Sequence, residues 1–167
     1  MYDELTEVDI KKMKEELDFR TGVERTRIRN LIIEAKELGD LSENAEYREA
    51  RREKGRNESR ITYLEDMIRT AKIITTNPNK EIVGIFDKVE VLYEAENEVE
   101  TYTISTTLRR DAGNNIISNQ SPLGSAVMGK KVGDRVFVKV SDQVGYYITI
   151  KSIQKGKDDD TLPITKY

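Results

Sequence analysis

Cysteine, histidine and tryptophan are all absent from this chain of 167 residues. Without cysteine there are no disulfide bonds and no thiolate nucleophiles. Without histidine as well, zinc sites built from Cys and His and every catalytic triad that depends on an imidazole are excluded. We therefore expect any chemistry of this chain to rest on carboxylates.

Long apolar segments are also missing. No run of about eighteen apolar residues occurs, which is the length that a membrane-spanning helix requires. The opening residues MYDELTEVDI have neither the basic start nor the apolar core of a secretory signal peptide. We therefore expect a cytoplasmic protein without a membrane association.

Neither sign of charge dominates the sequence. The 28 Lys and Arg side chains and the 31 Asp and Glu side chains give a net charge of −3. This balance is too even for the whole protein to bind nucleic acid through its net charge, so only local clusters of one sign are candidate binding sites.

The sequence pattern changes near the TTNPN segment, where Pro78 and its flanking asparagines favour a break between elements. Helical spacing precedes this segment and strand-like alternation follows it. We expect residues 1–76 to form a helical domain with an acidic tip at 39–46, residues 77–157 to form a β-rich domain, and residues 158–167 to be a C-terminal tail without assigned chemistry.

Two segments of the first domain place apolar residues three or four positions apart, as in helices that pack along one side. The first covers residues 10–38, follows a capping pattern of Thr6 and Asp9, and is followed by Gly39, which suits a helix C-terminus. The second covers residues 47–71 as a heptad seam. Because the connection is short, the two helices must form a long antiparallel coiled-coil hairpin.

An antiparallel hairpin also predicts which residues face each other. In such a hairpin, the numbers of two facing residues add up to nearly the same total along its whole length. With this pairing, polar positions face polar positions and apolar positions face apolar positions. Gly22 is the weak point of the first helix, since glycine in a helix interior costs about 1 kcal/mol relative to alanine. The expected pairs are Leu31 with Ala50, Glu24 with Asn57, Leu17 with Leu64, Met13 with Ile68, and Ile10 with Ala71.

The second domain shows the period-two alternation of β-branched and aromatic residues that is typical of strands. We expect strands at residues 88–93, 99–104, 135–140 and 145–150, and one short helix that starts after Ser121 with Pro122 at its first position. The expected fold class is α+β, a helical hairpin followed by a β-rich domain.

Two carboxylates, Asp40 and Glu43, lie in the segment between the helices. One interpretation is a capping pair that satisfies the free amides at a helix start. The other is a site for a divalent cation, since Mg²⁺ prefers oxygen ligands and takes one or two carboxylates from a protein. Two acids alone do not complete a metal site, so a partner would have to supply further ligands.

Basic residues follow the tip. Arg48, Arg52 and Arg56 are spaced by four and share one helix face, with Arg51 beside them. Mixed with glutamates, such a run is commonly a solvated helix face with internal ion pairs. The alternative is a surface that holds a phosphate backbone, with Tyr47 as a stacking platform or as part of the helix seam.

Two blocks of sequence resemble the bacterial Gre transcript cleavage factors, the GreA and GreB family. The first runs from Glu37 to Tyr47 through the tip and continues with Ala50–Glu53 and Glu58–Ile61. The second runs from Ile117 to Asp134 and includes Ser121 and Pro122. Both blocks are long and occur in the family's order, and the resemblance extends from Leu5 to Ile153.

The resemblance implies a particular fold and partner. Members of the family have an N-terminal antiparallel coiled coil and a C-terminal domain with an FKBP-like β fold. That domain docks on RNA polymerase at the mouth of the secondary channel, where we associate Ser121 and Pro122 with docking. The coiled coil enters the channel, and backtracked RNA is cleaved at its 3′ end so that elongation restarts.

The resemblance also implies roles for the tip residues. Asp40 and Glu43 would help hold a second Mg²⁺, shared with polymerase aspartates, and orient the attacking water in a two-metal hydrolysis. Arg48, Arg51, Arg52 and Arg56 would steady the extruded RNA. On this basis the protein is an accessory factor and not an enzyme on its own, and Mg²⁺ is not bound stably by the factor alone.

Two other functions remain as alternatives. One is a Gre-like regulator that occupies the secondary channel without stimulating cleavage. The other is a prolyl isomerase or chaperone, which is disfavoured because such sites are lined by aromatic residues and this chain has no Trp and three Phe. Because the seam residues are satisfied within one hairpin, we expect a monomer.

Overall fold

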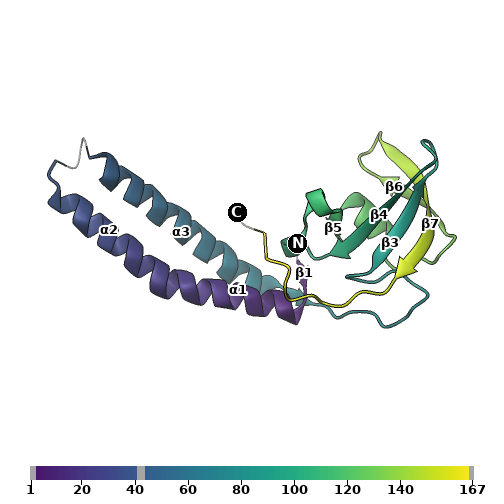
Figure 1. The fold of residues 1–167 in the computed structure, drawn as a ribbon, viewed down its shortest axis with the longest axis horizontal. Helices are drawn as coiled ribbons and strands as arrows, with labels where there is room; N and C mark the ends of the chain where they lie inside the picture. Colours follow the sequence, from purple (N-terminus) through teal and green to yellow (C-terminus); the bar gives the residue numbers. More distant parts are fainter. Residues whose placement is uncertain (1–2, 41–43, 166–167) are drawn as a thin grey trace. The chain divides into compact units, whose positions relative to one another are not determined.

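The computed structural model describes residues 3–40 and 44–165, which form two units. Residues 10–71 make up the helical hairpin, and residues 3–9 join residues 72–165 in the β-rich unit. Figure 1 shows the two arms of the hairpin and the strands of the β-rich unit. A helical hairpin and a β-rich domain were predicted, and both are confirmed.

The first arm of the hairpin contains three consecutive helical segments. These are α1 (Glu7–Phe19), a π-helical turn (Arg20–Glu24) and α2 (Arg25–Glu37). The capping pattern before α1 is confirmed, because the amide of Thr6 donates to Asp9 Oδ2 at 3.0 Å and the amide of Asp9 donates to Thr6 Oγ1 at 3.3 Å. After α2, Gly39 has a φ of +116°, as expected of a glycine that ends a helix.

The second arm is the single helix α3 (Ala45–Thr70), which runs antiparallel to the first arm (Figure 1). Apolar side chains from both arms form the seam between them, and each is at most 5% exposed. Burial of each large side chain contributes about 1.5–3 kcal/mol to the stability of the hairpin. The buried seam residues are Met13, Ile28, Ala35, Ala50, Ile61 and Leu64.

The register in the middle of the hairpin corrects one predicted pair. Asn57, expected opposite Glu24, instead accepts from Arg20 Nη1 at 3.1 Å and donates to the Arg20 carbonyl at 3.3 Å. A π-helical turn lies in this part of the first arm, where the amide of Arg25 donates to the carbonyl of Arg20 five residues earlier. The extra residue in this turn changes the spacing on which the predicted pairing relied.

A five-stranded mixed sheet forms the centre of the β-rich unit, with strand order β5-β4-β3-β7-β6. Only β4 and β5 run parallel, and the other neighbours are antiparallel. The four predicted strands are present, whereas the short β5 was not predicted. The strands are β3 (Lys88–Tyr93), β4 (Glu98–Ser105), β5 (Ile116–Ser118), β6 (Arg135–Lys139) and β7 (Gly145–Gln154).

Short elements complete this unit. The strands β1 (Glu4–Leu5) and β2 (Lys72–Ile73) pair in parallel and tie the first residues to the segment after α3. The helix α4 (Pro122–Val127) starts as predicted, with Ser121 as its N-cap. A core of buried residues, largely Val and Ile from the sheet with Leu123 and Val127 of α4, holds the unit together.

One buried arginine links three distant segments of the β-rich unit. Arg109 lies in a short 3₁₀ helix, and its side chain is 0% exposed. Its Nε contacts Asp9 Oδ1 at 2.7 Å, its Nη1 contacts Asp158 Oδ1 at 2.6 Å, and its Nη2 donates to Thr6 Oγ1 at 3.0 Å. The guanidinium also lies over the ring of Phe86. The segment after residue 157 therefore takes part in the packing of this unit.

No helix within residues 3–40 and 44–165 combines the length and the apolar character that crossing a membrane requires.

Candidate functional site

The tip of the hairpin is organised by Asn44, the N-cap of α3. Its side-chain oxygen accepts from the amide of Tyr47 at 3.0 Å, and its Nδ2 donates to the carbonyl of Ala35 at 2.7 Å. The first bond satisfies a free amide at the start of α3, and the second reaches back to the end of α2. One side chain therefore joins the two helices where the chain reverses.

Asn44, and not Asp40, is therefore the N-cap of α3. Asp40 is exposed and lies between Gly39 and the N-cap of α3. Glu43, the second predicted carboxylate, lies outside the described residues. Within the described ranges no group of three or more acidic side chains could hold a metal ion, so Asp40 would need ligands from elsewhere.

The four predicted basic residues do not form one uniform surface. Arg52 and Arg56 both contact Glu49, at 3.3 and 2.7 Å. Hydrogen bonds from these two arginines lower the pKa of Glu49 below its usual value. Arg51 instead lies over the ring of Tyr47, and Arg48 is exposed. The solvated face with internal ion pairs is thus present at Arg52 and Arg56.

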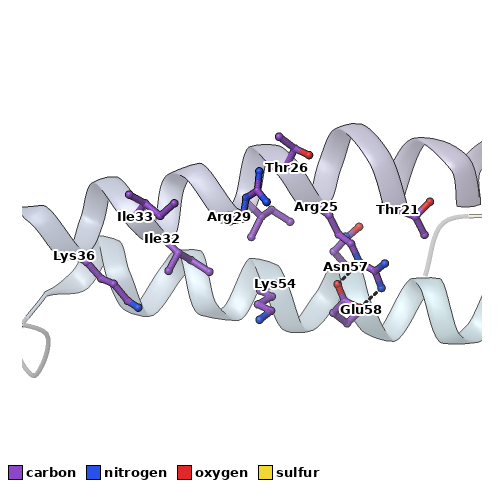
Figure 2. Close-up of a pocket in the computed structure, with 11 residues that line it drawn as sticks. Thr21, Arg25, Thr26, Arg29, Ile32, Ile33, Lys36, Lys54, Asn57 and Glu58 are labelled. Carbon is purple, nitrogen blue, oxygen red and sulfur yellow. Dashed lines mark hydrogen bonds and ion pairs between the residues drawn. The ribbon is translucent and has the colours of Figure 1, made fainter.

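A groove runs along the hairpin between α2 and α3, and we call it the hairpin groove. Its main part has a volume of about 720 Å³, and a neighbouring hollow toward the tip shares four of its lining residues. Figure 2 shows Ile32 between the two helices, with Lys36 of α2 and Lys54 of α3 beside it. The walls are Arg25, Arg29, Ile32 and Lys36 of α2 and Tyr47, Arg51, Lys54 and Glu58 of α3, with Ile28 and Ile33 as further apolar lining.

Both walls follow the same helical spacing. In each helix the four wall residues are at positions i, i+4, i+7 and i+11, which lie on one face of an α-helix. The antiparallel arrangement brings the first wall residue of α2 to the last of α3, and Arg25 accordingly donates to Glu58 at 2.8 and 2.6 Å. The hydrogen bonds of this pair lower the pKa of Glu58 below its usual value.

Sequence reasoning missed the groove because its cations come from two helices. Only Arg51 of the wall had been assigned to a binding surface, and Tyr47 was considered beside it. The spacing of Arg25, Arg29 and Lys36 in the sequence could have indicated a second face on α2. That this face meets Lys54 of α3 follows only from the fold of the hairpin.

The predicted docking residues, Ser121 and Pro122, lie in the β-rich unit at the start of α4. Ser121 Oγ donates to the carbonyl of Ser118 at 2.7 Å and accepts from the amide of Gly124 at 3.0 Å. Gly124 is required here, since an added Cβ would lie 2.0 Å from the carbonyl oxygen of Ser118. The turn is thereby held in one conformation that leaves Pro122 exposed.

Comparison with protein families places the two parts of the chain in one family. Residues 4–73 match the N-terminal model of the GreA/GreB transcription elongation factors, and residues 77–155 match the C-terminal model of the same factors. Together these matches cover nearly the whole chain.

Individual relatives agree with the family models. The chain is 44% identical over 145 residues to the transcription elongation factor GreA of Clostridium botulinum (strain Kyoto / Type A2), covering 86% of this chain and 90% of the relative. It is 44% identical over 137 residues to GreA of Thermoanaerobacter pseudethanolicus, covering 81% and 87%. It also aligns with the crystal structure of Thermus aquaticus Gfh1 at 24% identity and a TM-score of 0.42, covering 92% of this chain and 99% of that one.

The family models and the GreA relatives lead to the same assignment. This chain belongs to the GreA/GreB family of transcription elongation factors.

Proposed function

We propose that this elongation factor enters the secondary channel of bacterial RNA polymerase and stimulates the polymerase's own cleavage of backtracked nascent RNA. The observation that carries the proposal is Asp40 at the hairpin tip. Asn44 performs the capping of α3, so Asp40 is not needed for that purpose. An exposed carboxylate at the end of two long helices supports a role inside a partner's active site.

The donor set at the tip suits Mg²⁺. Asp40, together with Glu43 outside the described residues, would supply hard carboxylate oxygens, and the polymerase would supply the remaining ligands. Bound there, the ion would supply charge stabilisation and water activation in a two-metal hydrolysis of the phosphodiester. In this proposal the factor completes the site of another enzyme and has no catalytic centre of its own.

Two further surfaces support docking. Arg48, Arg51, Arg52 and Arg56 follow the tip and would contact phosphates of the extruded RNA near its 3′ end. In the β-rich unit, the rigid turn at Ser121 with exposed Pro122 would contact the rim of the channel.

The test is cleavage in a stalled polymerase complex. A backtracked complex with 3′-labelled RNA is mixed with Mg²⁺ and wild-type factor, Asp40→Asn or Glu43→Gln. Wild type is expected to release the labelled fragment, and each variant to reduce the rate at least about a hundredfold, as for loss of a metal-binding group. Glu34→Gln removes the same charge from an exposed position on α2 and serves as the matched control.

Two outcomes would contradict the proposal. If wild type binds the complex but leaves the RNA intact, the factor is a channel-occupying regulator without cleavage activity. If Asp40→Asn and Glu43→Gln cleave as fast as wild type, the tip carboxylates do not take part.

A further inference from the structure

Three isoleucines of α2 line the hairpin groove among its cations, and we call them its apolar floor. Ile28 is buried, Ile32 is half-buried and Ile33 is 49% exposed. An exposed isoleucine beside a second, half-buried one gains free energy when a partner covers it, at roughly 25 cal/mol per Å² of apolar surface. The floor is thus an apolar strip that the hairpin itself leaves partly uncovered.

The walls carry an excess of positive charge. Among the lining residues that the structure describes, Glu58 is the one acid, and Arg25 occupies both of its carboxylate oxygens. No direct ion pair joins Arg29, Lys36 or Lys54 to a described carboxylate, and the charge of Lys54 acts on Glu58 only from a longer distance. Three cations are therefore available to an external acidic group.

The length of the groove matches a short helix. Each wall covers i to i+11 of an α-helix, and at about 1.5 Å per residue this is roughly 16 Å. Three turns of a partner helix have the same length, and a partner with apolar residues at i, i+3, i+4 and i+7 would lie on the floor. Acidic residues beside that apolar stripe would face the cationic walls.

We propose that the hairpin groove binds an acidic amphipathic helix of RNA polymerase. The inference rests on the proposed function, because it assumes that the hairpin enters the polymerase. The partner helix would form a third helix along α2 and α3, with its apolar stripe on Ile32 and Ile33. Its carboxylates would pair with Lys36, Lys54 and Arg29.

The aliphatic floor favours a helix over a nucleic acid strand. Single-stranded nucleic acid is held by phosphates on cations and by bases on aromatic rings. The groove offers one ring, Tyr47, at its tip end, and two isoleucines, Ile32 and Ile33, along its α2 side. The Arg25–Glu58 pair at the other end places a carboxylate where a phosphate would have to pass. An amphipathic helix satisfies both the cations and the isoleucines.

The first test replaces one exposed aliphatic residue in the groove and one outside it. Ile33→Glu removes apolar contact and introduces an acid that competes for the cations, whereas Val23→Glu makes the same type of change at a 62% exposed position outside the lining. Affinity is measured for core polymerase free of nucleic acid. We expect Ile33→Glu to weaken binding about tenfold, as for an interface anchor, and Val23→Glu to leave it within about twofold.

A second pair of variants separates groove filling from stability. At Gly55, which lines the groove near the tip, an added Cβ meets no atom within 4 Å. Gly55→Ala and Gly55→Gln both improve helix propensity, by about 0.5–1 kcal/mol. Only Gln extends into the groove, so we expect Gly55→Gln to weaken polymerase binding relative to Gly55→Ala although both variants are at least as stable as wild type.

Other occupants give different results. If Ile33→Glu weakens binding of a single-stranded RNA oligonucleotide and leaves polymerase binding intact, the occupant is nucleic acid and the proposal is wrong. If light scattering shows a wild-type dimer that Ile33→Glu dissociates, the occupant is a second copy of the chain. Unchanged polymerase affinity in both Ile33→Glu and Gly55→Gln also overturns the proposal.

The cleavage assay tests the proposed function, and the affinity measurements test the groove. Wild type that binds polymerase without stimulating cleavage contradicts the proposed function, and the groove is still judged by the ratio of wild-type to variant affinity. Wild type that does not bind polymerase at all contradicts both.

Discussion

At the scale of single residues, Arg109 shows what a buried charge requires. Two carboxylates, a hydroxyl and an aromatic ring surround its guanidinium, which is inaccessible to water. Such a group is tolerated because two opposite charges lie beside it, and removing it leaves Asp9 buried without its counter-charge. The loss of this ion pair is therefore costly chiefly because it leaves a buried carboxylate without its counter-charge.

We predict that Arg109→Met destabilises the protein by about 3–5 kcal/mol, the usual effect of breaking a buried ion pair from one side. Urea unfolding measures the change in the free energy of unfolding. Arg110→Met, at the exposed neighbouring position, is the matched control and should stay within about 0.5 kcal/mol of wild type. Equal losses in both variants would show that the buried contacts are not responsible.

At the scale of elements, two glycines of the hairpin differ in backbone conformation. Gly22 lies in the π-helical turn, and Gly39 follows α2 with a φ of +116°. At either position an added Cβ meets no atom within 4 Å. Steric contact with the rest of the protein is therefore equal at the two sites, and backbone conformation alone distinguishes them.

We predict opposite signs for the same substitution at these sites. Gly22→Ala should stabilise the hairpin by about 0.5–1 kcal/mol, because it restricts the unfolded chain without straining the helix. Gly39→Ala should destabilise it by about 1–2 kcal/mol, because a positive φ is unfavourable for alanine. Urea unfolding followed by far-UV circular dichroism measures both. A stabilising Gly39→Ala would contradict the role of this residue in ending α2.

The middle of the hairpin is held by a polar cluster. Glu16 accepts from Arg60 at 2.9 Å through each carboxylate oxygen and from Arg20 at 2.7 Å. Burial raises the pKa of Glu16, but the hydrogen bonds and charges of the two arginines lower it more, so its pKa lies below the ordinary value of 4.5. The ionised form is therefore favoured in the folded hairpin.

This pKa direction predicts a pH dependence. Because the folded pKa of Glu16 is lower than the unfolded one, its contribution to stability is complete above about pH 4.5 and is lost as the pH falls through the folded value. Glu16→Gln should cost about 1–3 kcal/mol at neutral pH, and the difference from wild type should shrink toward pH 3. Urea unfolding at a series of pH values measures it. Glu15→Gln, in an exposed 3.9 Å pair with Lys11, should show little effect at any pH.

At the scale of the whole molecule, the chain after the family match belongs to the folded protein. The C-terminal family model ends at residue 155, yet Asp158 contributes an oxygen to buried Arg109. Thr165 further bonds to the carbonyl of Leu108 through its hydroxyl at 2.6 Å. This segment and residues 3–9 contact the same arginine from the two ends of the chain.

We predict that Asp158→Asn loosens residues 3–9 within the β-rich unit. Loss of the Asp158 charge beside Arg109 should raise the hydrogen-exchange rates of these amides about tenfold, because the ion pair with buried Arg109 is weakened. Hydrogen exchange followed by mass spectrometry measures the change. Glu96→Gln makes the same charge change at an exposed turn and should leave the rates unaltered. Unchanged exchange in Asp158→Asn would show that the C-terminal segment does not secure the start of the chain.

Local signals predicted the elements well because their causes act within a turn or two of the chain. The Thr6–Asp9 pattern did start a helix, Gly39 did end one, and Ser121 did cap α4. At the tip the same kind of reasoning failed. Asp40 and Asn44 are both suitable caps, and the choice of Asn44 depends on its second bond to Ala35, which exists only when the two helices lie side by side.

By itself, the sequence determined the two-part architecture, the helical and strand periods and the tip with its acidic and basic residues. Only the tertiary structure decided the register at the π-helical turn, the burial of Arg109 among Asp9 and Asp158, and the groove that joins Lys36 to Lys54. The physical reason is the distance along the chain over which each interaction acts. Periodicity and capping depend on neighbouring residues, whereas the choice of a distant charge partner or of a shared groove depends on how whole elements pack.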